Sequence, residues 1–183
     1  MKTLVFLAAA LSSLALARAQ NFTVNLDGAQ DGGGLRTGSG SGTLTLNTTL
    51  DTLTFNNITF SGLSANSFAG QIRGPGAPTV IANGLYNLAP QNGMPRFITL
   101  GGSSGSISGT LQLVANPASS GLDIPTQINQ LEAGLWYINI DTVAFGAGEI
   151  RGQILPVPEP SALPLLGIGV CGMWLLMRRH RSR

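Results

Sequence analysis

Apolar and polar side chains alternate with a period of two along most of this 183-residue chain. In the first such stretch, Phe22, Val24 and Leu26 are separated by Thr23 and Asn25. A period of two places successive side chains on opposite faces of a β-strand, so each stretch predicts a strand with one buried face. Strands are expected at 22–26, 43–46, 53–60, 67–73, 79–82, 96–100, 106–114, 135–141 and 148–155.

The connections between these stretches are rich in Gly, Ser, Asn and Pro, which favour turns. "GGGLRTGSGSG" and "GGSSGSISG" are typical of hairpin ends. The alternation slips by one residue at Asn56-Asn57, which indicates a β-bulge, with a hairpin turn as the alternative. About nine short strands joined in this way predict an all-β chain folded as an antiparallel sandwich or barrel.

One stretch, "DIPTQINQLEAG", does not follow the period of two. Asp123 could cap a helix, Pro125 suits a first turn and Gly134 could end it. We therefore expect one short helix at 124–133 across an end of the β-domain; a structured loop is the alternative.

The first 19 residues have the pattern of a signal peptide. Lys2 precedes an apolar run at 4–17, and Ala17-Arg18-Ala19 has the small-x-small pattern of a cleavage site. We expect the exported protein to begin at Gln20. A buried N-terminal helix is the alternative.

The last 27 residues, 157–183, form a tail of three parts. Val157-Pro158-Glu159-Pro160 comes first, then an apolar span at 162–177, then an arginine-rich end at 178–183. As a separate hydrophobic helix the 16-residue span would rise about 24 Å, short of a hydrocarbon core of roughly 30 Å.

This tail resembles the PEP-CTERM sorting signal of Gram-negative bacteria. The resemblance implies recognition by an exosortase-type protease, transient anchoring in the inner membrane, removal of the tail and delivery to the cell surface or the medium. A permanent membrane anchor is the alternative.

Between Gln20 and Val157 the chain has no Lys, His or Cys, and its acidic residues outnumber its arginines. The sequence pI of about 9.2 therefore reflects the two ends. This composition excludes disulfides, thiol chemistry and zinc or copper sites in the β-domain, and it provides no basic nucleic-acid footprint. No catalytic, cofactor or metal residues are predicted.

Two segments nearly repeat: "AGQIRGPG" at 69–76 and "AGEIRGQI" at 147–154. On strands, the isoleucines should point into the core and the polar residues to the opposite face. The predicted core residues are Ile72, Ile150 and Ile154, and the predicted opposite-face residues are Gln71, Arg73, Glu149, Arg151 and Gln153. "SGTL" at 41–44 and 108–111 also repeats, which predicts two topologically similar halves.

The segment "LEAGLWYINIDTVAFGAGEIRGQI" resembles the C-terminal signature of the CHRD domain. The resemblance extends over 22–155 and includes "NLDGAQD" and "QIRGP". The matching signature residues are Tyr137, Asn139, Thr142, Gly148, Glu149, Ile150, Arg151, Gly152 and Gln153. The resemblance implies a β-sandwich at 20–156, immunoglobulin-like or a related Greek key, in a secreted protein.

Three histidines of that family are replaced here, by Gln71, Arg73 and Asp141. An arginine and a carboxylate on neighbouring strands can form a charge-assisted pair. We therefore predict a structural clasp in which Arg73 lies near Asp141 or Glu149, while Arg151 is the other arginine of this group.

These observations favour an exported, non-enzymatic surface domain in adhesion, matrix assembly or contact with exopolysaccharide. Its expected partners are the export machinery, an exosortase-type protease and polysaccharide or other surface proteins. A polysaccharide-active enzyme using Asp141 and Glu149 is the alternative class. Calcium binding by Asp27 and Asp31 is a further alternative, although the EF-hand spacing is absent.

Overall fold

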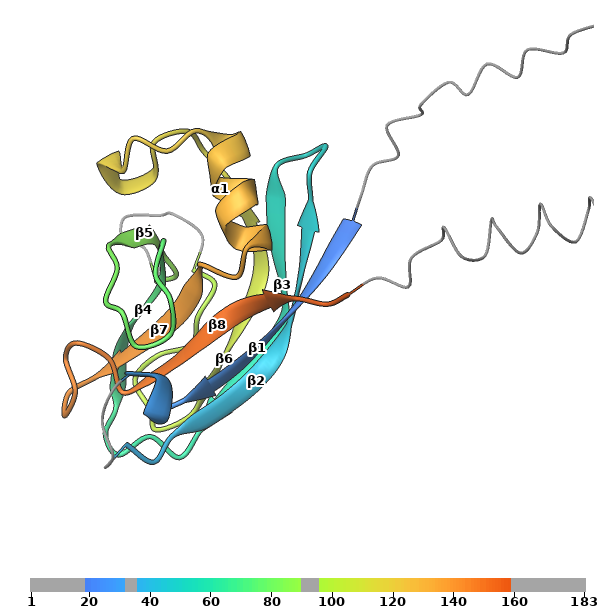
Figure 1. Ribbon diagram of the computed structural model, residues 1–183. Helices are drawn as coiled ribbons and strands as arrows, with labels where there is room; N and C mark the ends of the chain where they lie inside the picture. Colours follow the sequence, from blue (N-terminus) through green and yellow to red (C-terminus); the bar gives the residue numbers. More distant parts are fainter. Residues whose placement is uncertain (1–18, 32–35, 90–95, 159–183) are drawn as a thin grey trace, which may run out of the picture.

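The fold is a single antiparallel sheet curled around its core (Figure 1). The computed structural model describes residues 19–31, 36–89 and 96–158. The strands are β1 (Ala19–Asp27), β2 (Ser39–Asn47), β3 (Thr52–Ser61), β4 (Ser67–Arg73), β5 (Gly84–Asn87), β6 (Gly105–Gln112), β7 (Tyr137–Thr142) and β8 (Ile150–Pro156). Their order is β5-β4-β7-β8-β1-β2-β3-β6, which confirms the predicted all-β fold.

The apolar residues of each alternating stretch fill the inside of the curled sheet. Phe22, Leu44, Ile58, Ile138 and Ile154 are completely buried there, although they come from five different strands. Ile72 and Ile150 lie in the same core, so the predicted inward face of both Ile-Arg strands is confirmed.

The sheet's two end strands, β5 and β6, are linked by a connecting segment. Phe97 N–H donates to the Leu88 carbonyl at 2.9 Å, while Ser108 N–H donates to the Phe97 carbonyl at 2.8 Å. Ile98 forms an isolated bridge with Ile107 of β6. The stretch 96–100 therefore takes part in the sheet through one bridge and is not a full strand, which is why eight strands replace the expected nine.

The strand predicted at 79–82 is wrong. Those residues belong to a loop, and the strand in this part of the chain is β5, which begins at Gly84. Val80 and Ile81 are exposed although both favour strands, because the loop backbone is held by side chains of the sheet.

The bulge predicted at Asn56-Asn57 is confirmed. The pairing of β3 with β6 shifts between Phe55 and Ile58, and Asn57 has φ 53°. Since β3 runs unbroken through this point, the alternative of a hairpin turn is wrong.

The predicted helix is confirmed as α1 (Ile124–Glu132), which crosses one end of the sheet in Figure 1. The Asp123 carboxylate caps it by accepting from Thr126 N–H at 2.9 Å. Gly134 follows with φ 68°, the left-handed conformation that suits a residue just past a helix end. Two short 3-10 turns, η1 (Ala29–Asp31) and η2 (Pro117–Ser119), complete the elements.

The prediction of two topologically similar halves is wrong, because the strand order differs between them. The two SGTL segments lie on β2 and β6, and both strands pair with β3. β2 and β3 are neighbours, whereas β6 and β7, which would correspond to them, are far apart in the sheet.

The residues predicted to form the sorting signals lie at or beyond the margins of the described residues. Ala19 and Gln20 begin β1, whereas Ala17 lies outside the described residues. Val157 N–H donates to the Asn21 carbonyl at 2.8 Å. Pro158 is the last described residue, so Glu159, Pro160, the apolar span 162–177 and the tail 178–183 lie outside.

No helix within the described ranges has the length and apolar character needed to cross a membrane.

Candidate functional site

The loop between β4 and β5, residues 74–83, is held at several backbone positions by buried side chains of the sheet, and we call it the clamped loop. It contains no charged residue and exposes 52% of Val80 and 77% of Ile81. Thr79 has φ 68°, which a β-branched residue rarely adopts. Such a backbone persists where surrounding contacts determine it, and loops held by a rigid scaffold often carry binding function.

Arg151 of β8 provides the central contacts to this loop. Its side chain is 1% exposed, and its guanidinium donates to the carbonyls of Val80 and Ala77, both at 2.7 Å. The same group donates to Gln153 Oε1 at 3.0 Å and lies 3.4 Å from the centre of the Tyr137 ring. A planar guanidinium can serve two carbonyls and a ring face together, which an ammonium cannot.

Gln153 and Tyr137 hold further points of the clamped loop. Gln153 Nε2 donates to the carbonyl of Gly76 at 3.0 Å and to that of Gly134 at 2.8 Å. Ala82 N–H donates to the Tyr137 hydroxyl at 2.9 Å. With Arg151, these side chains bond four backbone positions of the loop, and they form a scaffold buried beneath it.

The two carboxylates of the predicted clasp lie at the other end of the β7–β8 pair, and both are buried. Glu149 is 0% exposed and accepts from Ser64 N–H and from the Thr142 hydroxyl. Asp141 is 3% exposed and accepts from Asn139 Nδ2. The Glu149 carboxylate therefore fixes the chain that enters β4.

Arg73 does not reach either carboxylate, which corrects the expected clasp. It lies opposite Tyr137 on β7, whereas Asp141 lies opposite Ala69, four residues further along β4. Four residues of a strand span roughly 13 Å, more than the length of an arginine side chain. Arg73 Nε instead donates to Gln71 Oε1 at 3.0 Å.

The sequence placed Glu149, Arg151 and Gln153 on the face opposite the core, and the structure confirms this. It did not indicate that this second face is also buried. The burial of this face could have been inferred from the stretch 74–83. That stretch is rich in Gly and Pro, has no charged residue, and is long enough to fold back over a neighbouring strand.

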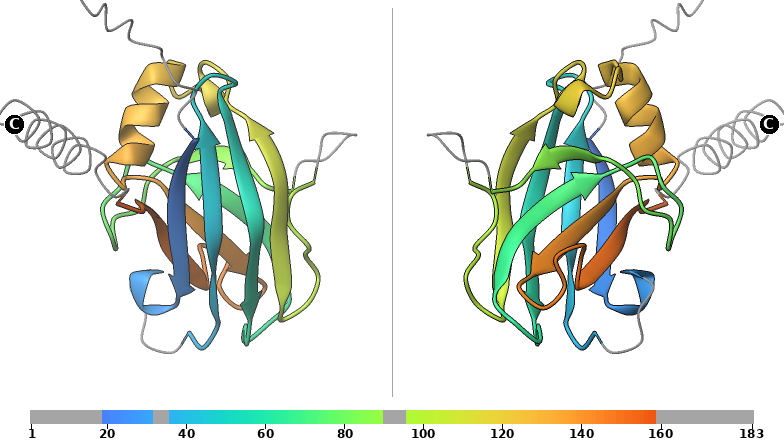
Figure 2. Two further views of the ribbon diagram at one scale, coloured as in Figure 1. Left: turned by 90° about the vertical axis from the view of Figure 1, so that its right-hand side faces the viewer. Right: turned by 90° about the vertical axis from the view of Figure 1, so that its left-hand side faces the viewer.

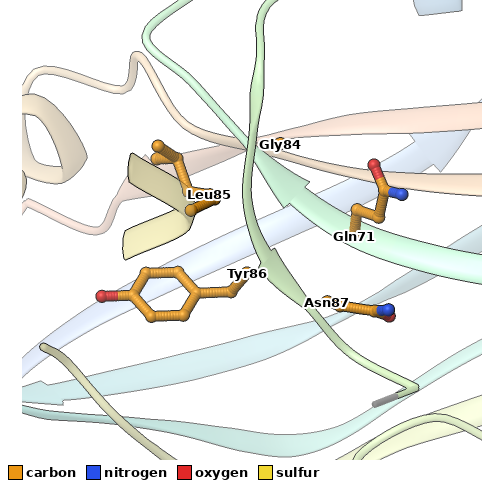
Figure 3. Close-up of a pocket in the computed structure, with 6 residues that line it drawn as sticks. Gln71, Gly84, Leu85, Tyr86 and Asn87 are labelled. Carbon is orange, nitrogen blue, oxygen red and sulfur yellow. The ribbon is translucent and has the colours of Figure 1, made fainter. Parts of the chain in front are cut away.

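A small surface pocket of about 180 Å³ lies beside β5 (Figure 3). It is lined by Gln71, Gly84, Leu85, Tyr86, Asn87 and Ala118. The Tyr86 hydroxyl donates to Gln127 Oε1 at 2.6 Å, and burial raises the pKa of Tyr86. The lining carries no carboxylate, and the volume is below the range of about 300–1,000 Å³ usual for small-molecule sites.

Nothing in the described ranges groups three His, Cys, Asp or Glu side chains as a metal site would require. At the acidic turn considered for calcium, the Asp27 carboxylate accepts from Gln30 N–H and from Gln30 Nε2, both at 2.8 Å. These bonds build the η1 turn.

A family model described as the CHRD domain matches residues 22–154, from β1 to β8. Neither a curated protein nor a solved structure matches the chain.

Proposed function

The chain belongs to the CHRD domain family, which indicates an extracellular β-domain, and from this premise we propose that it is an exported, non-enzymatic contact domain of the cell surface or matrix. One observation carries the non-enzymatic part. The ionisable side chains of the signature strands, Asp141, Glu149 and Arg151, are at most 3% exposed. Glu149 and Arg151 hold the backbone of loops, and Asp141 accepts from the Asn139 side chain, so their contacts are structural.

Sorting by an exosortase-type system forms the second part of the proposal. It is supported by the order of motif, apolar span and arginines in the tail. It is also supported by the position of Val157, which is bonded to Asn21 where β8 ends. A protease acting on the next residues would cut immediately outside the folded domain. Until that cut, the tail would anchor the protein transiently in the inner membrane of a Gram-negative cell.

The test is mass spectrometry of the native protein from separated cell fractions. We expect Gln20 as the first residue, loss of the apolar tail, and location in the surface or extracellular fraction. A matched variant, Pro158→Ala with Pro160→Ala, should keep the tail and stay with the membrane. Intact ends in a cytosolic protein would refute export, and an unprocessed tail in the wild type would favour the permanent anchor.

The competing class, an enzyme using Asp141 and Glu149, has its own test. We expect no turnover when the full-length protein is screened against polysaccharides. Glu149→Gln is the control, and its thermal unfolding shows whether the variant is folded. Turnover that disappears in a folded Glu149→Gln variant would reject the contact domain in favour of a hydrolase.

A further inference from the structure

The outer surface of β1, β2, β3 and β6 is an open face whose one charged residue, Asp27, lies at its edge, and we call it the neutral face. Figure 2, left, shows these four strands side by side, and no other described element lies in front of them. Asp27, at the end of β1, is the one charged residue in the four strands. The outward side chains of the four strands are Ser, Thr, Asn or Gln, except Ala19 and Asp27 at the two ends of β1.

The pairing register arranges these side chains in straight rows across the sheet. Asn21 lies opposite Thr45, Thr45 opposite Thr54, and Thr54 opposite Thr110, so one row crosses all four strands. Rows recur every second residue, about 7 Å apart, and their members are about 4.8 Å apart. The result is a grid of short hydroxyl and amide groups, interrupted where the register shifts at the bulge in β3.

Hydrogen bonds within the grid orient its members. The Thr45 hydroxyl donates to Asn21 Oδ1 at 3.1 Å, and Asn56 Nδ2 donates to the Thr45 oxygen at 3.0 Å. The hydroxyls of Thr54 and Thr110 are 3.0 Å apart. Groups held in this way lose less conformational freedom when a ligand binds than isolated surface side chains do.

The near-absence of charge, with Asp27 at the edge as the one charged residue of the four strands, is the informative property of this face. A protein surface usually carries roughly 25–35% charged residues, and these give solubility. The outer face of β8 differs, since the polar side chains of Arg151 and Gln153 are covered by the clamped loop. On the neutral face the polar groups are left open, and they offer many donors and acceptors with no field to select ions.

We propose that the neutral face binds a neutral, soluble polysaccharide chain that runs across the strands. This inference rests on the proposed function, because it supplies the partner of the contact domain. The distance between neighbouring strands is close to the length of one sugar residue in an extended chain, so successive sugars can meet successive strands. Uncharged hydroxyls complement this face, whereas the carboxylates or sulfates of an anionic polymer meet no cation there.

The twist of the sheet selects among neutral carbohydrates. Neighbouring strands rotate by about 20–25° relative to one another, so the rows follow a curved surface. A single chain in solution can follow that curve, whereas the flat surface of a crystalline fibre cannot. The face also carries no aromatic ring, so each sugar is held weakly and binding depends on many repeats along one chain.

The test is affinity electrophoresis of the full-length protein through gels that contain dextran, hydroxyethyl cellulose or alginate. We expect retardation by a neutral polymer, little retardation by alginate, and the same retardation at about 0.05 M and 0.5 M salt, because no ion pairs are screened. Short oligosaccharides should compete at least tenfold less well than the polymer.

Thr54→Arg places a long charged side chain in the centre of the grid and should reduce the apparent affinity at least tenfold. Asn129→Arg adds the same side chain to the exposed surface of α1 and is the matched control, expected to bind like the wild type. Thr110→Arg is a second variant of the grid should Thr54→Arg unfold.

Three results would overturn the inference: no retardation by either neutral polymer, equal retardation of Thr54→Arg and Asn129→Arg, or preference for alginate. A fourth result, a dimer that Thr54→Arg dissociates, would also overturn it and would assign the face to a second copy of this chain. Each result leaves the export test unaffected, since that test reads the processed ends and the cell fraction.

Discussion

Replacing Arg151 by methionine tests whether the buried guanidinium holds the clamped loop. The substitution removes the hydrogen bonds of 2.7 Å to the Val80 and Ala77 carbonyls, the bond of 3.0 Å to Gln153 Oε1, and the contact with the Tyr137 ring. The methionine side chain is nearly as long as that of arginine, and it is apolar. The variant therefore removes the polar contacts with little loss of packing.

The magnitude follows from the kind of bonds lost. Hydrogen bonds to a charged group contribute about 1.5–3 kcal/mol each, and an arginine over a ring contributes about 2 kcal/mol where water is excluded. Removing the buried charge also removes its desolvation cost, which offsets part of the loss. The net decrease in the free energy of unfolding should be about 3 kcal/mol, or roughly 10 °C in Tm.

The chain supplies its own matched control, because Arg73 has the same Ile-Arg-Gly context and a different environment. It is partly exposed and donates from Nε to Gln71. Arg73→Met should cost less than about 1 kcal/mol, the range of exposed polar contacts. Arg151→Lys should be intermediate, since one ammonium cannot reproduce the fork that reaches both carbonyls.

Two measurements check this prediction. Thermal unfolding followed by circular dichroism gives Tm for the wild type and the three variants. Hydrogen exchange at the backbone amides of 76–83 reports the loop itself, and it should be faster in Arg151→Met than in Arg73→Met. Equal Tm losses in the two methionine variants, or unchanged exchange in the loop, would refute the role assigned to Arg151.

Three further predictions concern stability, and each is checked by unfolding of the purified variant. Gly152→Ala should destabilise the domain by about 2 kcal/mol or more, because its new Cβ would overlap the backbone carbonyl oxygen of Asn25 on β1. A wild-type Tm would contradict this close approach. Tyr86→Phe should cost about 1–2 kcal/mol, since it removes the donor to buried Gln127; an unchanged Tm would show that water replaces the hydroxyl. Hydrogen bonds from the Thr126 side chain and from its backbone N–H lower the pKa of Asp123. The cap's contribution is therefore complete above the normal carboxyl pKa and is lost as the pH falls through the lowered one. The difference in Tm between wild type and Asp123→Ala should therefore shrink on acidification, and a constant difference would argue against the cap.

Several features of the fold could be read from local sequence. The alternation of Phe22, Val24 and Leu26 identified a core face, and the phase slip at Asn56-Asn57 located a bulge. The cap and stop residues of α1 defined its limits nearly to the residue. These features depend on a few adjacent residues, so the chain's own periodicity carries the information.

The structure of 79–82 and 96–100 was harder to predict, because their apolar residues favour strands but lie in connecting segments. Val80 and Ile81 favour strands, but the carbonyl of Val80 accepts from a side chain on β8, about seventy positions away in sequence. Such a bond is absent from any local pattern. The sequence therefore predicted only part of the candidate site. It identified the residues of the site but not the loop that they hold.

The sequence by itself determined which side chains share a face, because side-chain direction along a strand is a local property with a period of two. It also determined the uncharged composition of the neutral face and the capping of α1. Only the tertiary structure decided that Arg73 stays near the surface while Arg151, in the same Ile-Arg-Gly context, is buried beneath the clamped loop. The physical reason is that burial depends on strand order and register, which arise from contacts between residues far apart in the chain.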